Sequence, residues 1–445
     1  MEGYIRNVFE RLIVDFHVSE IPKPRPRELK FPSFPSSIRK AIVLIGMRRS
    51  GKTWAVYERM QMLLGGGLDK TKILYINFED DRLSSMGTDD FQALLDAYFS
   101  LYPQHADRSD LHFFFDEIHE VAGWEKFIRR LLDQERMQLY ITGSSAKMLG
   151  KEIASALRGR TYVIEVFPFS FREFLAYHNL AFALPLSSKA AAALSHHARN
   201  YLRSGGFPEV LALPENLHRT LLQGYMDVVI HRDIEERYNV GHPLLLRDLL
   251  RHCLQNAASL MSVLKLYQRF KSLGRSIGKD SLYAYMDYFQ DAYCLFIVPA
   301  YSHSLHQRNL LPKKIYPADS GLITAYTIKP ETEESARLEN AVFCELRRQT
   351  EAIFYYRTRE GGEVDFFVLF PDGRKALYQV CVSLSNAETF QRETQSLVGA
   401  LKETHLSAAT VITLNEEKEI RLAGRRIRCI PIGRWLLTGD ASLRR

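Results

Sequence analysis

The chain has 445 residues, of which 46% are hydrophobic, so it is long and apolar enough for two to four domains with buried cores. Lys and Arg number 59 and Asp and Glu 52, and the formal charge of +7 permits contact with nucleic acid without requiring it. No apolar stretch approaches the roughly 20 residues that cross a bilayer, and no export signal is evident, so we expect a cytoplasmic protein with no membrane partner. The 5 cysteines lack paired spacing, which argues against a structural zinc site.

The first expected element is a helix, which ends before a connector at residues 21–35. The prolines of this connector exclude a continuous helix, so residues 1–36 form a first segment. In the second segment, residues 37–180, five apolar strands alternate with helical patterns. This alternation predicts an α/β fold, with a parallel sheet covered by helices on both faces. The strands are expected at residues 41–45, 73–78, 112–115, 139–142 and 162–166.

The first strand leads into a glycine-bracketed loop that matches G-x-x-x-x-G-K-[ST]. In this pattern the glycines let backbone N–H groups converge on phosphate oxygens, and the following helix offers its positive end. Lys52 would reach the β- and γ-phosphates, and the Thr53 hydroxyl would bind Mg²⁺. The alternative is an ordinary strand, turn and helix. The predicted phosphate-binding residues are Gly46, Arg48, Arg49, Ser50, Gly51, Lys52 and Thr53.

The third strand contains three consecutive Phe and ends in two carboxylates, Asp116 and Glu117. A strand buried on both faces would deliver these acids to the carboxyl edge of the sheet, where ligands of open α/β sheets bind. Asp116 would bind Mg²⁺ through water, and Glu117 would orient or deprotonate the attacking water. The alternative is a surface acidic turn. The two motifs together describe a nucleoside triphosphatase.

The fourth strand is followed by Ser144 and Ser145, whose hydroxyls could lie near the γ-phosphate, although Gly-Ser-Ser is also a common turn. Residues 181–240 have a helical pattern interrupted by Gly205 and Gly206, which is typical of a lid over a nucleotide. In this segment Arg232 is either a phosphate sensor or part of an ordinary ion pair.

Residues 241–330 contain three amphipathic helices, expected at 245–254, 263–272 and 279–288, and then an apolar strand-like segment and a basic KKIY. This order is typical of a winged helix. The third helix would be the recognition helix, but its Asp280, Asp287 and tyrosines favour a packing role over a place in the major groove.

These segments resemble a known family, the bacterial and archaeal AAA+ ATPases that join an AAA_14-type ATPase domain to a C-terminal DUF4143 domain. The resemblance covers nearly the whole chain. It implies a P-loop NTPase sheet with a helical lid, a winged-helix-like segment and, at residues 331–445, an α/β domain similar to restriction endonucleases of the PD-(D/E)xK type. ATP and Mg²⁺ are implied as cofactors. The segments that carry it are IGMRRSGKT, YINFEDDRL, FFFDEIHEVAGWEKFIRRL, YITGSSAKML, LRGRTYVIEVFPFSFREFL, YLRSGGFPEVL, HRDIEERY, KKIYPADSGL, RLENAVFCELRR and GGEVDFFV.

The resemblance also implies roles for single residues. Ser144 or Ser145 takes the sensor-1 position. Arg158 and Arg160 become candidates for an arginine finger, because a guanidinium can neutralise charge that develops on the γ-phosphate. The finger could act within one chain or on a neighbouring subunit of a homo-oligomer. The alternative is that both arginines pair with local acids or face solvent.

Nucleases of the resembling fold arrange a helix Glu, a strand Asp and an E/Q-x-K triplet around a divalent metal. Glu339 and Asp365 fit the first two positions. The triplet has Gln379 at the acid's position but Cys381 where the lysine belongs, and a thiol cannot supply the fixed positive charge. Lys375 lies an even number of residues earlier and could replace it. We therefore expect a degenerate nuclease-like scaffold that binds DNA or protein partners and does not cleave DNA.

The function that these observations favour is an ATPase that hydrolyses ATP with Mg²⁺ to drive conformational change of its C-terminal modules. Basic clusters at residues 269–279 and in the segment RRIRCIPIGRW favour an association with DNA, although solvated faces also explain such runs. One alternative is a slow nucleotide-dependent switch that binds protein partners. Another is an ATP-licensed nuclease.

Overall fold

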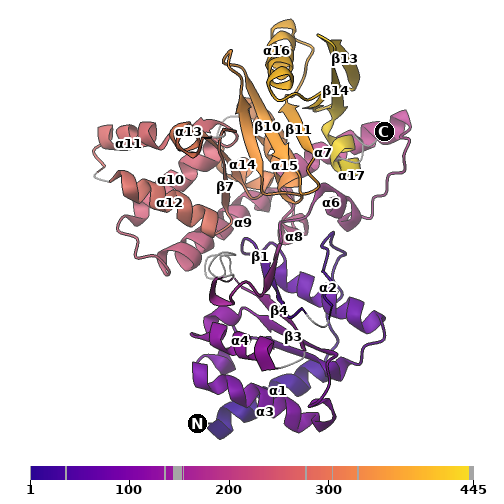
Figure 1. Cartoon of the computed structure of the whole chain (residues 1–445), viewed down its shortest axis with the longest axis vertical. Helices are drawn as coiled ribbons and strands as arrows, with labels where there is room; N and C mark the ends of the chain where they lie inside the picture. Colours follow the sequence, from indigo (N-terminus) through magenta and orange to yellow (C-terminus); the bar gives the residue numbers. More distant parts are fainter. Residues whose placement is uncertain are drawn as a thin grey trace. The chain divides into compact units, whose positions relative to one another are not determined.

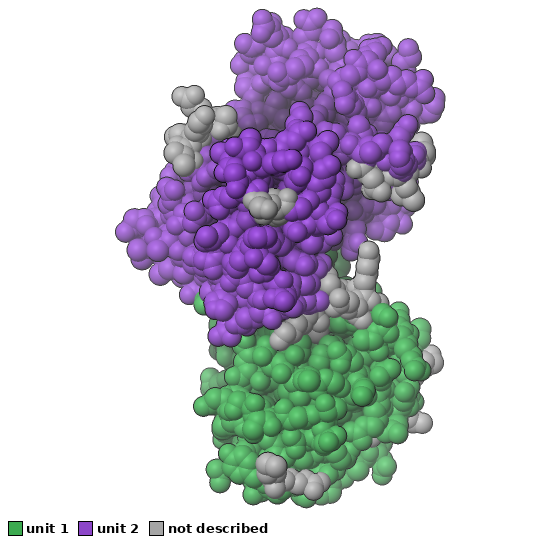
Figure 2. Space-filling model, turned by 90° about the vertical axis from the view of Figure 1, so that its left-hand side faces the viewer, with its two compact units in different colours: residues 1–167 green, residues 168–445 purple. Residues whose placement is uncertain are grey.

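The computed structural model describes residues 2–35, 38–134, 137–143, 153, 155–275, 278–302, 304–327 and 330–439. The chain forms two compact units, Met1–Phe167 and Pro168–Arg445, which are coloured separately in Figure 2. Among the described residues, none of the helices has both the length and the apolar character needed to cross a membrane.

Unit 1 contains the parallel sheet that the alternating pattern predicts (Figure 1). Its strand order is β2-β3-β4-β1-β5, and all four strand pairs are parallel. The fold prediction is therefore confirmed, with strand ends that differ from expectation by one or two residues. The strands are β1 (Ala41–Ile45), β2 (Ile73–Asn77), β3 (Leu111–Asp116), β4 (Met137–Thr142) and β5 (Thr161–Glu165).

Helices cover both faces of this sheet, and the three consecutive Phe of β3 explain why. Successive side chains of a strand point to opposite faces. Phe114 stacks on Tyr140 with ring centroids 4.3 Å apart, in the cluster that α2 completes. Phe115 faces the other way and meets Phe127 of α4 at 5.9 Å, and Figure 1 shows α2 and α4 on opposite sides of the strands. The helices are α1 (Glu2–Val18), α2 (Lys52–Gly65), α3 (Phe91–Leu101) and α4 (Trp124–Gln134), with short 3-10 turns η1 (Lys70–Lys72), η2 (Asp81–Leu83), η3 (Thr88–Asp90), η4 (Pro103–His105) and η5 (Ile118–Glu120).

Unit 2 begins with helices and continues into a three-stranded sheet of order β6-β8-β7, in which both strand pairs are antiparallel. The three helices expected between residues 245 and 288 are α10, α11 and α12, so these element predictions are confirmed. The elements are α6 (Phe171–Tyr177), α7 (Ser188–Ser204), α8 (Pro208–Leu211), α9 (Glu215–Val228), a π-helix (Val229–Glu235), α10 (Pro243–Gln255), β6 (Leu260–Met261), α11 (Val263–Ser272), α12 (Lys279–Asp291), β7 (Leu295–Val298), α13 (Leu305–Leu310) and β8 (Lys313–Pro317).

The chain then forms a mixed six-stranded sheet of order β13-β14-β12-β11-β10-β9. The first three strands form an antiparallel meander, and β12 joins β11 in parallel after a helix. This is the C-terminal α/β domain that the family resemblance implies. Its elements are α14 (Ser320–Tyr326), α15 (Pro330–Arg347), β9 (Ile353–Arg357), β10 (Glu363–Leu369), β11 (Lys375–Val380), α16 (Ala387–Glu403), β12 (Ala408–Thr413), β13 (Lys418–Leu422), β14 (Arg425–Pro431) and α17 (Ile432–Thr438).

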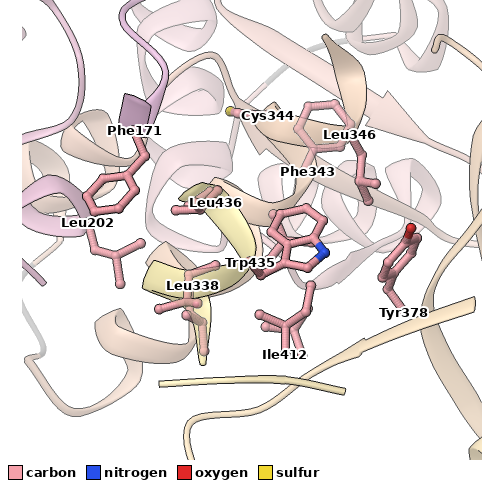
Figure 3. Packing of buried hydrophobic residues seen from close by; sticks show 14 of the residues in the cluster. Phe171, Leu202, Leu338, Phe343, Cys344, Leu346, Tyr378, Ile412, Trp435 and Leu436 are labelled. Atoms are coloured by element: carbon pink, nitrogen blue, oxygen red, sulfur yellow. The ribbon is translucent and has the colours of Figure 1, made fainter. Parts of the chain in front are cut away.

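The six-stranded sheet is covered on both faces. One face packs against α16, whose Leu397 and Leu401 are fully buried there. The other face packs against α15 and α17, and Figure 3 shows the Trp435 side chain of α17 beside Ile412 and Tyr378 of the sheet. The same cluster includes residues of α6 and α7. The helices that follow unit 1 in sequence are therefore part of the C-terminal core.

Two glycine-containing segments of unit 2, one with Gly205 and Gly206 and the other with Gly321, contact the same buried carboxylate, that of Asp319. Its Oδ1 accepts a hydrogen bond from Gly321 N and its Oδ2 accepts one from Gly206 N, both at 2.8 Å. Burial raises the pKa of Asp319 to about 6, although these two N–H donors act in the opposite direction. A Cβ at Gly205 would lie 1.6 Å from Asp319 Oδ1. The segments YLRSGGFPEV and PADSGL thus serve to join the end of α7 to the start of α14.

Candidate functional site

The phosphate-binding motif forms a tight turn between β1 and α2. Gly46 has φ +150°, and a Cβ there would lie 2.2 Å from the carbonyl oxygen of Val166. Gly51, with φ +96°, precedes the first residue of α2, so the helix N-terminus opens directly onto the loop. Lys52 is buried, and its Nζ donates to the carbonyl oxygens of Gly46 (3.1 Å) and Met47 (3.4 Å).

The loop has the chemistry that a nucleotide phosphate chain requires. The Ser50 hydroxyl is fully buried and has no hydrogen-bond partner among the described residues. An orphaned hydroxyl of this kind is costly, and a phosphate oxygen would satisfy it. The Lys52 ammonium supplies a positive charge in the same loop. These residues therefore fit the phosphate chain of a nucleotide.

Asp116 lies at the carboxyl end of β3 and is 1% exposed. Its Oδ1 accepts a hydrogen bond from the Thr142 hydroxyl, and its Oδ2 accepts one from the Tyr75 hydroxyl at 3.1 Å. Burial and then the charge of Glu117 raise the pKa of Asp116, while hydrogen bonds from Thr142, Thr53 and Tyr75 oppose the rise. Asp116 thus lies at the carboxyl edge of the sheet, where a Mg²⁺ ion held by the phosphate-binding loop would need a carboxylate.

Glu117 adopts a left-handed backbone conformation, with φ +51°, directly after β3. Its N–H donates to the Thr142 hydroxyl at 3.1 Å, which fixes the turn to the adjacent strand β4. Its Oε2 lies 3.3 Å from Nδ1 of His119, a buried side chain whose Nε2 lies 3.1 Å from Glu120 Oε1. His119 therefore lies between the predicted catalytic carboxylate and Glu120. The DEIHE pattern did not predict a role for this histidine.

Glu79, which follows β2, lies at the same edge of the sheet. Burial and then the charge of Glu117 raise the pKa of Glu79, and Arg48 opposes the rise. The Arg48 Nη1 atom lies 3.8 Å from Glu79 Oε1. Arg48 of the loop is thus held beside the acids, whereas Arg49 is exposed, with φ +66°.

Arg27, which no sequence pattern predicts as a site residue, contacts the phosphate-binding loop from the proline-rich connector. Its guanidinium is buried and donates to the carbonyl oxygens of Ser50 (3.1 Å) and Phe167 (2.6 Å). Its own N–H donates to Glu58 Oε1 in α2 at 2.8 Å. Because hydrogen bonds to charged groups are strong, these contacts fix the carbonyl that precedes Gly51.

We expect Arg27→Ala to weaken nucleotide binding about tenfold, since hydrogen bonds to a charged group contribute about 1.5–3 kcal/mol. Titration with a fluorescent ATP analogue would measure the change. Arg27→Lys should restore little, because one ammonium cannot reproduce the planar fork that contacts both carbonyls. Arg25→Ala, at an exposed position of the same connector, is the matched control. Unchanged affinity in Arg27→Ala would show that the loop holds its shape without this brace.

The two arginine-finger candidates lie near the amino ends of the parallel strands, whereas the phosphate-binding loop lies at their carboxyl ends. The carbonyl of Arg160 accepts a hydrogen bond from Ala41 N, at the start of β1, whereas the loop follows Ile45. Five strand residues span about 17 Å, which is more than an arginine side chain can reach. Arg160 pairs with Asp133, and Arg158 is exposed. A role within one chain does not fit this position, and a role on a neighbouring subunit stays a prediction.

The remaining predicted nucleotide contacts are partly outside the described residues. Ser144 and Ser145 lie in an undescribed stretch, so the sensor-1 assignment stays a prediction. Arg232 is exposed, and its Nη1 lies 3.1 Å from Glu236 Oε1. Arg232 thus forms the ordinary ion pair that was the alternative to a phosphate sensor.

In unit 2 the predicted nuclease-like residues lie together, but a lysine lies among them. Glu339 projects from α15 and Asp365 from β10, and both side chains are buried. Lys314 of β8 places its Nζ 3.0 Å from Glu339 Oε1, 2.7 Å from Asp365 Oδ1 and 2.9 Å from Glu363 Oε1. The Tyr316 hydroxyl donates to Glu339 Oε1 at 2.7 Å. We call Lys314, Glu339, Glu363 and Asp365 the lysine cluster.

The other predicted members of this site have different partners. The Gln379 side-chain oxygen accepts from Asp365 N at 3.2 Å, and its Nε2 donates to Glu393 Oε2 at 2.6 Å. Burial raises the pKa of Cys381 to about 12, so its thiol is neutral. Lys375, the suggested replacement for the missing lysine, is exposed.

A divalent metal does not fit the lysine cluster. The Lys314 ammonium already contacts the carboxylate oxygens of Glu339 and Asp365 that would ligate the metal. With Lys314 in place, moreover, the described part of the chain contains no group of three or more His, Cys, Asp or Glu side chains that could hold a metal ion. No step of a nuclease reaction can be derived from this arrangement.

The sheet order, the phosphate-binding loop and the strand-end acids define an AAA-type P-loop ATPase domain. A family model described as an AAA domain matches residues 38–175. Two further models match residues 195–333 (Domain of unknown function DUF8612) and 335–435 (Domain of unknown function DUF4143). The chain belongs to the bacterial and archaeal family that joins an AAA_14-type ATPase domain to a C-terminal DUF4143 domain.

The relatives include an uncharacterized protein of Methanocaldococcus jannaschii, 31% identical over 97% of this chain and 95% of that protein. Another is an uncharacterized protein of Haemophilus influenzae, 28% identical over 73% and 78% of the two chains. Among solved structures, the Walker-type ATPase of Pyrococcus abyssi is 14% identical, covers 72% of this chain and 95% of its own, and has a TM-score of 0.38. The Aeropyrum pernix Orc1 protein in complex with DNA is 12% identical over 77% and 94%, with a TM-score of 0.29.

Proposed function

We propose that the chain hydrolyses ATP with Mg²⁺ and uses the cycle to move its helical and C-terminal modules while associated with DNA. The observation that carries the ATPase part is the phosphate-binding loop itself, in which the Lys52 ammonium and the buried, unpartnered Ser50 hydroxyl lie at the N-terminus of α2. ATP with Mg²⁺ supplies the phosphoryl group. Lys52 holds its oxygens, and Glu117 orients the attacking water and accepts its proton.

Support for the DNA part comes from residues 243–317. The order of helices and strands, α10-β6-α11-α12-β7-α13-β8, is that of a winged helix in which the short helix α13 lies between the last two strands. The exposed residues of α12 include Asp280 and Asp287, which a phosphate backbone would repel. Helix α11 instead exposes Lys265, Arg269 and Lys271. We therefore assign the DNA contact to α11 and not to the third helix.

The test is steady-state phosphate release from ATP with and without duplex and single-stranded DNA. We expect DNA to raise turnover severalfold in the wild type. The triple variant K265A/R269A/K271A should lose most of this stimulation and keep the basal rate, because lost phosphate contacts weaken binding to any sequence. The control K189A/R219A/K402A removes the same charge from exposed positions on α7, α9 and α16 and should respond to DNA like the wild type.

The other candidate functions predict different results. Turnover that is indifferent to DNA, in the wild type and the triple variant alike, would contradict the DNA association and favour a switch that binds protein partners. Strand cleavage with Mg²⁺ or Mn²⁺ that disappears in Asp365→Ala would instead establish an ATP-licensed nuclease. We expect no cleavage, because Lys314 fills the site that the metal would need.

A further inference from the structure

Lys314 has the contacts of a structural cation and not of a catalytic lysine. An ammonium group has three donors and no acceptor. Lys314 Nζ has three carboxylate neighbours within 3.0 Å, from Glu339, Glu363 and Asp365. Two of these contacts, to Glu339 Oε1 and Asp365 Oδ1, are hydrogen bonds, and the third, to Glu363 Oε1, is an ion pair. The side chain is 3% exposed, so solvent does not compete for these donors.

The carboxylates of the cluster are held in place by the fold. The pairing of β9 with β10 shifts register between Val364 and Phe367, and such bulges re-aim side chains. Asp365 lies in this interval, and its Oδ2 accepts a hydrogen bond from Val380 N at 2.8 Å. Glu339 is fixed by the Tyr316 hydroxyl. Buried carboxylates held so closely need a cation, because their unpaired burial is strongly unfavourable.

We propose that Lys314 is the resident cation of this cluster: it takes the place of a divalent metal, excludes metal ions, and turns a nuclease-like site into an ion pair that joins β8 to α15 and β10. The lysine comes from outside the motif, 25 residues before Glu339 and 51 residues before Asp365. The cation that is missing at Cys381 is thus supplied by another element of unit 2.

Lys314 and a metal ion cannot share the cluster. Mg²⁺ requires oxygen ligands at about 2.0–2.1 Å in near-octahedral geometry. The ammonium occupies the space between the Glu339 and Asp365 oxygens, and two cations at this separation repel each other strongly. Burial lowers the pKa of Lys314, but Asp365 and the other acidic neighbours outweigh it and raise the pKa well above its ordinary value. The ammonium therefore stays charged and does not give way to a metal at neutral pH.

Removal of Lys314 should free the three carboxylates of the lysine cluster to bind a metal ion. Binding of Mn²⁺ to the full, nucleotide-free chain can be counted by electron paramagnetic resonance. We expect Lys314→Ala to bind one equivalent more than the wild type, and the double variant Lys314→Ala/Asp365→Asn to lose that equivalent. Mn²⁺ should also raise the melting temperature of Lys314→Ala by several degrees more than that of the wild type. Lys313→Ala, the neighbour on β8, is the matched control and should bind like the wild type.

A second comparison does not depend on how well Lys314→Ala folds. Asp365→Asn in the otherwise unchanged chain should bind as much Mn²⁺ as the wild type, because the wild-type cluster holds no metal. Loss of one equivalent in Asp365→Asn would overturn the proposal. So would a folded Lys314→Ala variant that binds no more Mn²⁺ than the wild type. Any weak Mn²⁺ binding near Asp116 is common to all these variants and cancels from the comparison.

Discussion

Glu117→Gln should lower the rate of ATP hydrolysis by about 10²–10⁴-fold while leaving ATP binding nearly unchanged, since a positioned general base contributes about this much. The amide has the shape of the carboxylate and can keep the turn that Thr142 holds. It cannot take a proton from water. Single-turnover hydrolysis and titration with a fluorescent ATP analogue would measure the two effects separately.

Glu120→Gln is the matched control for this prediction. Both acids contact the same histidine, because His119 Nδ1 lies 3.3 Å from Glu117 Oε2 and His119 Nε2 lies 3.1 Å from Glu120 Oε1. The Glu120 side chain is 38% exposed, whereas that of Glu117 is 13% exposed. Only the change at position 117 should abolish turnover. Equal losses in the two variants would mean that the carboxylates act by holding His119 and that another group activates the water.

The ATPase unit could be predicted from the sequence because its chemistry lies in contiguous motifs. The phosphate-binding loop is a single run of residues. The consecutive residues Phe113, Phe114 and Phe115 predict a strand that is buried on both faces. Alternating side chains then place Asp116 at the carboxyl edge without any knowledge of distant contacts. All five strands of the sheet were found in this way.

The residues that hold the site in shape were not predictable by the same means. Arg27 lies in a connector without helix or strand, so no periodicity marks it as buried. Its contacts reach 23 residues to Ser50 and 140 residues to Phe167. A basic residue among prolines is usually solvated, and only the folded loop shows which carbonyls it binds. Sequence reasoning detects local patterns, and Arg27 belongs to none.

The C-terminal domain shows a different limit. The sequence pattern predicted Glu339 and Asp365 correctly as neighbours and showed that Cys381 replaces the expected lysine. It suggested Lys375, on the same strand, as the replacement cation, whereas the structure has Lys314 in that role. The KKIY segment offered two lysines, Lys313 and Lys314, which point to opposite faces of β8. A shift of one residue would bury the other lysine, and an isolated strand of five residues does not specify that choice. The sheet register and α15 decide it.

Gly205→Ala should destabilise unit 2 by about 3 kcal/mol or more. The residue has φ +74° and ψ −162°, a region of backbone conformations that is essentially restricted to glycine and costs other residues about 1–3 kcal/mol. In addition, the new Cβ would lie 1.6 Å from Asp319 Oδ1. Asp319 would have to move, and the amides of Gly206 and Gly321 would lose their buried acceptor.

Hydrogen exchange of the full chain, followed by mass spectrometry, can measure this effect where it arises. Peptides that contain Gly206 should exchange far faster in Gly205→Ala, because the N–H to Asp319 bond opens more often. The matched control is Gly224→Ala in α9, where a Cβ would meet nothing within 4 Å. That exposed helical position should gain about 0.5–1 kcal/mol, since alanine favours the helix over glycine. Wild-type protection at Gly206 in Gly205→Ala would show that the α7–α14 junction can rearrange, and that the two glycine motifs have a role other than fixing it.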